Sequence, residues 1–245
     1  MTYRQLDASR IIETLRRLEQ RIAERFPSGG LVNVCRDLIT IAGQTEARSQ
    51  SIAKPNLALR IGIAIAIIAG LAGLVVVAQS IHVEMGNSEI FSILQGVEAA
   101  ANIVVLVGAA LFFLVSLETR HKRSRSLGDL HALRSIAHVI DMHQLTKDPS
   151  LYISGATVTS SSPERTMTAF ELTRYLNYCS EMLSLTNKLA AVYAQHLPDA
   201  VVIEAVNDIE TLTTNLSSKI WQKITIIDAA KVPRQDKQRE PGGQT

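Results

Sequence analysis

Residues 61–78 read IGIAIAIIAGLAGLVVVA, a run without one charged side chain. A helix of ~20 apolar residues crosses the ~30 Å hydrocarbon core of a bilayer, and residues 79–83 can complete that length. Core helices of soluble proteins rarely lack polar residues over such a distance. The run therefore predicts a membrane-spanning helix over about residues 60–81.

A second apolar stretch follows at residues 97–117, VEAAANIVVLVGAALFFLVSL, and only Glu98 and Asn102 interrupt it near its start. It predicts a second span, which together with the first forms a transmembrane hairpin within residues 57–119. The first run lies behind a charged amphipathic region, which is not the pattern of a signal peptide. We therefore expect an all-α membrane protein with two spans in the mature chain.

Basic residues flank this hairpin on both outer sides. Arg48, Lys54 and Arg60 precede the first span, and the loop of residues 79–96 contains neither Lys nor Arg. The positive-inside rule then places both termini in the cytoplasm. We expect the basic residues after the second span to rest on phospholipid headgroups rather than on nucleic acid: Arg120, Lys122, Arg123 and Arg125.

Charge and cysteine content narrow the function further. A net charge of +2 gives no global field for nucleic acid, so we expect no nucleic-acid partner. Cys35 and Cys179 are too few for a disulfide framework and show no zinc-type spacing. Cys179 falls in line with apolar residues that share one helix face, so it is predicted to be a small packing residue rather than a nucleophile.

The rest of the chain predicts cytosolic helices. Amphipathic helices are expected at residues 3–26 and 31–53, and Gly128 marks a position where the helix after the second span could break. Ser162 followed by Pro163 is typical of a helix start. The expected segments are N-terminal cytosolic helices (1–56), a membrane-proximal helix (120–147), a Ser/Thr-rich loop (148–165), an antiparallel helical hairpin (166–230) and a disordered tail (231–245).

Apolar residues in that hairpin recur at alternating intervals of three and four, which predicts coiled-coil-like packing within or between chains. On the first helix of the hairpin these residues form a seam, which consists of Leu172, Leu176, Cys179, Leu183, Thr186, Ala190 and Tyr193.

The segment RSIAHVIDMHQLTKDPS, residues 134–150, holds the richest polar cluster. With His131, the side chains of Arg134, His138 and Asp141 share one helical face, and His143 points elsewhere. His131 and His138 are about 10.5 Å apart along the axis, too far to bind one ion. We interpret the face mainly as a contact surface that fixes helix register. His138 and Asp141 remain candidate ligands for a metal ion, and a ligand pocket near residues 147–149 is a further alternative.

Two features lie inside the predicted membrane segment. Gly62, Ala66 and Gly70 are four residues apart, a spacing that lets helices pack closely. Glu98 and Asn102 lie one turn apart at about the outer boundary of the second span. They predict either a polar cap or the mouth of an oligomeric pore.

The layout of a cytosolic helix, two closely spaced spans and the run LETRHKR at residues 117–123 resembles the SLATT group of bacterial two-span membrane proteins. The resemblance covers roughly residues 30–145. It implies a membrane effector in conflict or antiphage systems, with pore formation as one mode of action.

We therefore expect a non-enzymatic, homo-oligomeric protein of the bacterial inner (plasma) membrane, without a cofactor. Its cytosolic helices would mediate self-association or bind a cytosolic protein partner. Two alternatives stay open: a membrane-bound metal-dependent enzyme that uses His138 and Asp141, and an oligomeric ion channel or transporter component with Glu98 and Asn102 along its path.

Overall fold

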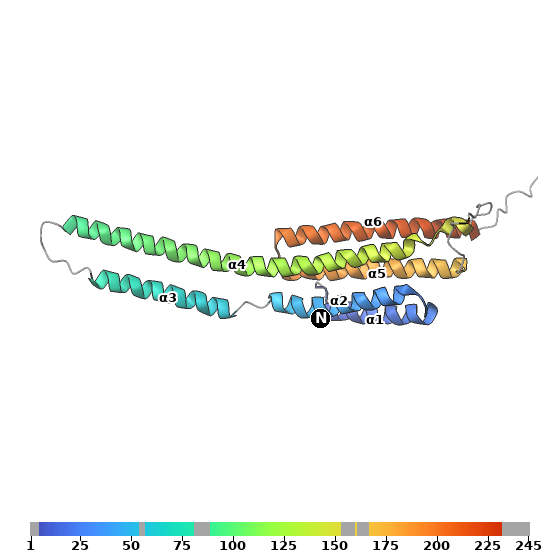
Figure 1. Ribbon diagram of the computed structural model, residues 1–245, viewed down its shortest axis with the longest axis horizontal. Helices are drawn as coiled ribbons and strands as arrows, with labels where there is room; N and C mark the ends of the chain where they lie inside the picture. Colours follow the sequence, from blue (N-terminus) through green and yellow to red (C-terminus); the bar gives the residue numbers. More distant parts are fainter. Residues whose placement is uncertain (1–4, 54–56, 81–88, 153–159, 161–166, 232–245) are drawn as a thin grey trace, which may run out of the picture. The chain divides into compact units, whose positions relative to one another are not determined.

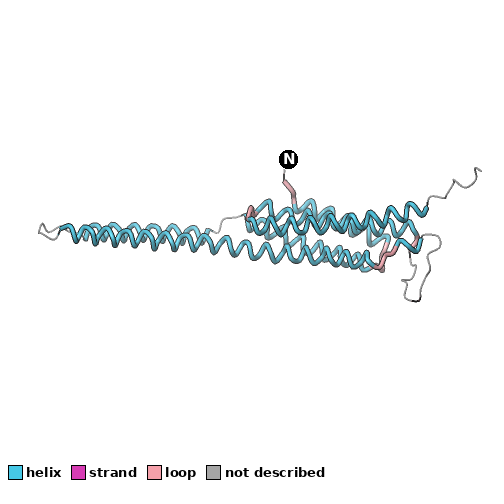
Figure 2. The backbone as a smooth tube through the Cα atoms, turned by 90° about the horizontal axis from the view of Figure 1, so that it is seen from above, coloured by secondary structure: helices cyan, strands magenta, loops and turns pink. Residues whose placement is uncertain are grey.

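The computed structural model describes residues 5–53, 57–80, 89–152, 160 and 167–231. These residues form α-helices and one short 3-10 helix, η1 (Pro149–Tyr152), and no strand is present among them (Figure 1, Figure 2). The all-α class predicted from the sequence is confirmed. The α-helices are α1 (Ala8–Arg25), α2 (Gly30–Ala53), α3 (Leu57–Ser80), α4 (Glu89–Leu145), α5 (Ala169–His196) and α6 (Ala200–Lys231).

The chain divides into two compact units. Unit 1 consists of Met1–Ser51 and Ser126–Thr245, and unit 2 consists of Ile52–Arg125. Helix α4 contributes to both, because it runs without interruption from Glu89 to Leu145. The break considered near Gly128 is therefore absent. A helix tolerates one glycine at a cost of roughly 1 kcal/mol, which the packing of the neighbouring turns can offset.

The buried apolar side chains of unit 1 come from α1, α2, α4, α5 and α6. The most extensive contact is between α5 and α6, which run side by side and are joined by residues 197–199 (Figure 1). All seven residues of the predicted α5 seam are buried. Helix α6 likewise buries residues at intervals of three and four. Those side chains are Val202, Val206, Ile209, Thr213, Leu216, Ile220, Ile224 and Ile227.

Helix α1 packs its apolar stripe on this core and ends before Pro27, as the sequence predicts, although it begins at Ala8 rather than near residue 3. The carboxylate of Asp7 caps it by accepting a hydrogen bond from the backbone N–H of Ser9. A bidentate ion pair, Arg21 Nη1 and Nη2 with Glu181 at 2.8 and 3.1 Å, links α1 to α5.

Helix α5 begins at Ala169, later than the predicted start at Pro163, and residues 161–166 lie outside the described residues. The reason is a capping box. The Thr168 hydroxyl accepts from the backbone N–H of Glu171 at 3.2 Å, and Glu171 Oε2 accepts from the backbone N–H of Thr168 at 2.7 Å. Two backbone N–H groups at the helix start thus find acceptors. The predicted disordered tail, apart from Lys231, also lies outside the described residues.

The Thr168→Ala variant should lower the free energy of unfolding by about 1 kcal/mol, because the cap loses its acceptor. Thr173→Ala is the matched control, since the Thr173 hydroxyl only donates back to the carbonyl of Ala169 inside the helix. Urea unfolding of the full chain in detergent, followed by circular dichroism, measures both. Equal losses in the two variants would contradict the role of Thr168 as a cap.

Candidate functional site

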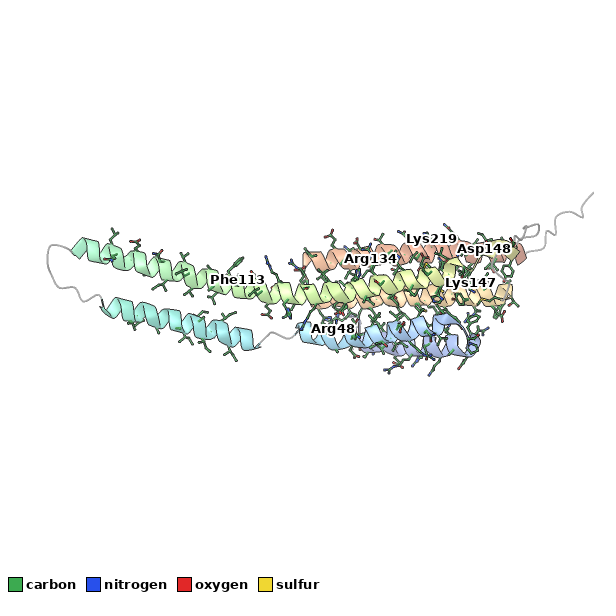
Figure 3. The ribbon with its side chains drawn as sticks, in the orientation of Figure 1. Arg48, Phe113, Arg134, Lys147, Asp148 and Lys219 are labelled. Carbon is green, nitrogen blue, oxygen red and sulfur yellow. The ribbon has the colours of Figure 1, made fainter. Side chains whose placement is uncertain are left out.

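The predicted polar face of α4 makes few contacts. Arg134 Nη1 lies 3.7 Å from Asp208 Oδ2 on α6, and both side chains are about half exposed (Figure 3). Asp141 accepts a hydrogen bond from Nε2 of Gln144 at 2.5 Å. The face therefore touches a neighbouring helix only along its edge.

The two histidines of that face are exposed. Neither His131 nor His138 makes a hydrogen bond or an ion pair with another described residue. Within the described ranges, no group of three His, Cys, Asp or Glu side chains is arranged to hold a metal ion. The arrangement thus brings no third ligand to His138 and Asp141.

His143 points elsewhere, toward α2 and α5. Its Nδ1 lies 3.5 Å from the hydroxyl of Tyr175, and a Cβ atom built on Gly30 would lie 2.8 Å from its Cε1. A larger first residue of α2 would therefore displace the imidazole from its present position. Lys147 Nζ lies 5.4 Å from the centroid of the Tyr175 ring, a cation–π contact.

A polar cluster at the end of α4 connects that helix to α6. Lys223 Nζ donates to the carbonyl oxygen and to Oε1 of Gln144, both at 2.7 Å. Burial lowers the pKa of Lys223, and the nearby carboxylates of Asp148 and Asp141 partly oppose that effect. An ammonium group at the last carbonyls of a helix satisfies acceptors that lack intrahelical partners. The cluster therefore fixes where α4 ends against α6.

A second polar network centres on Asp129, which is only 8% exposed. Tyr193 Oη on α5 donates to Asp129 Oδ2 at 2.9 Å, and Arg48 on α2 forms an ion pair with Oδ1 (Figure 3). Burial raises the pKa of Tyr193, while its hydrogen bond with Thr45 and the charge of Arg48 act in the opposite direction. Three helices of unit 1 thus meet at one buried carboxylate.

The Asp129 network was not foreseen from the sequence. Arg48 and Asp129 are 81 residues apart, and no local pattern relates them. One signal was present: Asp129 lies on the same helical face as Leu133 and Ile136, where a carboxylate requires a buried partner. Both Arg48 and Asp129 lie close in sequence to the points where the chain passes into unit 2.

Both cysteines are buried packing residues. The Cys35 thiol donates to the carbonyl of Leu15 at 3.8 Å, and Cys179 lies within the α5 seam. Burial raises the pKa of each thiol to about 12. A thiol in this state is a poor nucleophile at neutral pH.

These thiols predict a loss of stability in alkali. Because their pKa values are higher in the folded chain than the ordinary 9.0, the folded state holds more protons between pH 9 and about 12. The free energy of unfolding should therefore fall as pH rises through this window, by about 1.4 kcal/mol for each thiol at pH 10. Urea unfolding at pH 8 and pH 10 measures the loss. Cys179→Val should show a smaller loss, and an unchanged loss would contradict the assignment.

Unit 2 exposes apolar side chains. Leu106 is 70% exposed and Phe112 is 77% exposed, and Phe113 projects outward from α4 (Figure 3). By length and composition, one helical stretch among the described residues is long and apolar enough to cross a membrane, Leu94–Leu145, and none of its most apolar window is buried. In α3, the described residues Ile61–Gly70 form a shorter apolar stretch.

The small and polar residues predicted within unit 2 differ in their surroundings. A Cβ atom on Gly70 would lie 3.2 Å from Cγ2 of Val107, so α3 and α4 approach closely there. A Cβ atom built on Gly62 would have no neighbour within 4 Å, and Ala66 is exposed. Glu98 and Asn102 are both exposed on α4.

The basic residues expected at the headgroups follow on the same helix. Arg120 and Arg125 are exposed, whereas Lys122 and Arg123 are partly buried. Lys122 Nζ lies 2.8 Å from Glu118 Oε1, one turn earlier on α4.

A comparison of the chain with known protein families, with curated proteins and with solved structures found no significant match.

Proposed function

We propose that this chain is a non-enzymatic, homo-oligomeric integral membrane protein. In this proposal α3 and the apolar part of α4 cross the bilayer, and unit 1 is a cytosolic module for self-association or partner binding. Its most concrete form is an effector that perturbs the membrane in response to a cytosolic signal. The bacterial inner membrane, with both termini in the cytoplasm, is the location that the flanking basic residues favour.

The exposure of the apolar helices carries this proposal. Soluble proteins rarely expose contiguous apolar patches larger than a few hundred Å². Here long aliphatic and aromatic side chains are more than half exposed along both helices of unit 2, among them Ile65, Ile68, Val105, Leu106 and Phe112. A bilayer covers such a surface, and helices satisfy their own backbone hydrogen bonds within it.

The contact between the two helices supports the same arrangement. Gly70 lets the backbone of α3 approach Val107 of α4 more closely than a larger residue would. Small residues at helix–helix contacts are the typical means by which membrane helices pack, because hydrophobic burial gives no net advantage in lipid. This contact between Gly70 and Val107 supports the proposal that α3 and α4 form a transmembrane hairpin.

Membrane fractionation tests the proposal. The full chain should remain in the pellet after an alkaline carbonate wash and should dissolve only in detergent. Sizing by light scattering in that detergent should then give a mass of more than one copy. Protein in the carbonate supernatant would overturn the membrane assignment, and a clean monomer in detergent would overturn the oligomeric one.

An oligomeric channel is the second candidate, and the exposure of Glu98 and Asn102 favours it. They lie one turn apart on the surface of the otherwise apolar stretch 97–117 of α4, where lipid gives a carboxylate no partner. We expect Glu98→Gln to reduce cation conductance in planar bilayers by about tenfold if these residues line a pore. Ser92→Ala, just before the apolar stretch, serves as the control. Equal conductance in wild type and Glu98→Gln would remove Glu98 from the path.

A further inference from the structure

Helix α4 has a second seam on the side opposite its buried face. Residues at alternating intervals of three and four, from 128 to 145, are all exposed. The buried face has the same alternation, from Ser126 to Gln144. We call the exposed set the outer seam; it consists of Gly128, His131, Ser135, His138, Met142 and Leu145.

The composition of the outer seam is unusual for a surface that faces water. It contains no Lys, Arg, Asp or Glu, although exposed helix faces usually carry such residues. Its far end exposes two large apolar side chains, Met142 at 65% and Leu145 at 56%. A Cβ atom on Gly128 would meet nothing within 4 Å. Depletion of fixed charge is the compositional mark of the centre of a protein–protein interface.

We infer that the outer seam is a contact between two copies of this chain, formed as a parallel pair of α4 helices. The inference rests on the proposed function. If α4 of every copy enters the bilayer in one orientation, the cytosolic ends of two such helices run parallel. In a parallel pair each seam position meets its own counterpart.

The outer seam suits pairing with itself. His131 and His138 are seven residues apart and occupy equivalent heptad positions, so each imidazole faces an imidazole. A neutral imidazole has one donor and one acceptor, which allows the two rings to bond to each other. Ser135, between the two histidines, and Gly128, which precedes His131, are small enough for the backbones to approach. Polar residues at such positions fix register and helix number at some cost in stability.

Charged groups beside the seam do not oppose this pairing. Arg134 flanks it on the α6 side and is already close to Asp208 of its own chain. Asp141, on the same side, accepts from Gln144. Because the seam itself has no fixed charge, two identical copies meet without the repulsion that a strongly charged partner face would cause.

Cysteine cross-linking in native membranes tests the pair. Ser135→Cys places a thiol in the outer seam, and Thr214→Cys places one on the exposed face of α6. The native Cys35 and Cys179 are buried and should not compete. We expect a covalent dimer from Ser135→Cys to form at least about tenfold faster than from Thr214→Cys, because the pair raises the effective thiol concentration. Equal rates would overturn the inference.

Two further measurements separate this inference from the proposed function. The double variant His131→Glu, His138→Glu should lose the dimer in detergent while circular dichroism stays unchanged, since four carboxylates would then face one another. One outcome is an oligomeric wild type without faster cross-linking of Ser135→Cys and without loss of the dimer in the double variant. In that case the outer seam is not the interface, and the oligomeric proposal stands. If the wild type is a monomer, the outer-seam inference and the oligomeric proposal both fail.

Discussion

The Leu106→Arg variant should fail to insert α4 into the membrane. Leu106 lies near the middle of the apolar part of α4 and is 70% exposed. Arginine at the centre of a transmembrane helix costs about 2.5–3.5 kcal/mol on insertion scales, and the favourable contribution of leucine is lost as well. We therefore expect a total penalty of about 3–4 kcal/mol, enough to reverse the partition of this helix between bilayer and water.

The consequence is a change of topology. If α3 still inserts and α4 does not, the residues after α4 end on the outer side of the membrane. A carboxyl-terminal alkaline phosphatase fusion, active only outside the cytoplasm, should therefore be inactive on the wild type and active on Leu106→Arg. Protease protection of inverted vesicles gives an independent measurement of the same change.

The matched control is Trp221→Arg. Trp221 is 61% exposed on α6, so both substitutions place a charge at an exposed apolar position. In unit 1 the change should alter the free energy of unfolding by less than about 0.5 kcal/mol, because the arginine is hydrated there. If Leu106→Arg is as well tolerated as Trp221→Arg in both fractionation and fusion activity, α4 does not cross a membrane.

Local periodicity made much of unit 1 predictable. Leu172, Leu176 and Leu183 recur at the spacing of one helix face, and each is buried. Such a pattern needs no knowledge of the partner, because a helix buries its apolar stripe in any packed arrangement. The capping signal T-x-x-E at Thr168 is equally local, but the helix start predicted from the sequence was Ser162–Pro163.

Contacts between distant segments were not predictable in this way. The face of α4 that contains His131 and His138 is polar and exposed, whereas the face that packs contains Leu133, Ala137 and Ile140. Burial of apolar side chains determines which face of a helix packs against its neighbours, and the polar side chains of the opposite face then remain exposed. Which carboxylate meets which cation depends on the packing of whole helices, so a single sequence could not relate Asp129 to Arg48.

That buried network predicts the largest effect on the stability of unit 1. Asp129→Ala should lower the free energy of unfolding by about 2 kcal/mol, because it removes a buried carboxylate that accepts a hydrogen bond from Tyr193 and pairs with the half-exposed Arg48. The Tyr193 hydroxyl loses its acceptor at 2.9 Å, and the Arg48 guanidinium loses its carboxylate. Asp129→Asn keeps an acceptor oxygen for Tyr193 and should lose only about 1 kcal/mol.

Arg134→Ala is the matched control for Asp129→Ala. It removes an ion pair between two helices of unit 1, that of Arg134 on α4 with Asp208 on α6, and this pair lies at an exposed position. Exposed pairs contribute about 0–1 kcal/mol, so this variant should be nearly neutral. Urea unfolding in detergent, followed by circular dichroism, compares the variants. A double-mutant cycle of Asp129→Ala with Tyr193→Phe should then give a coupling of about 1 kcal/mol or more. If Asp129→Ala is no more destabilising than Arg134→Ala, the carboxylate does not hold α2, α4 and α5 together, and the apolar seams alone determine how they pack.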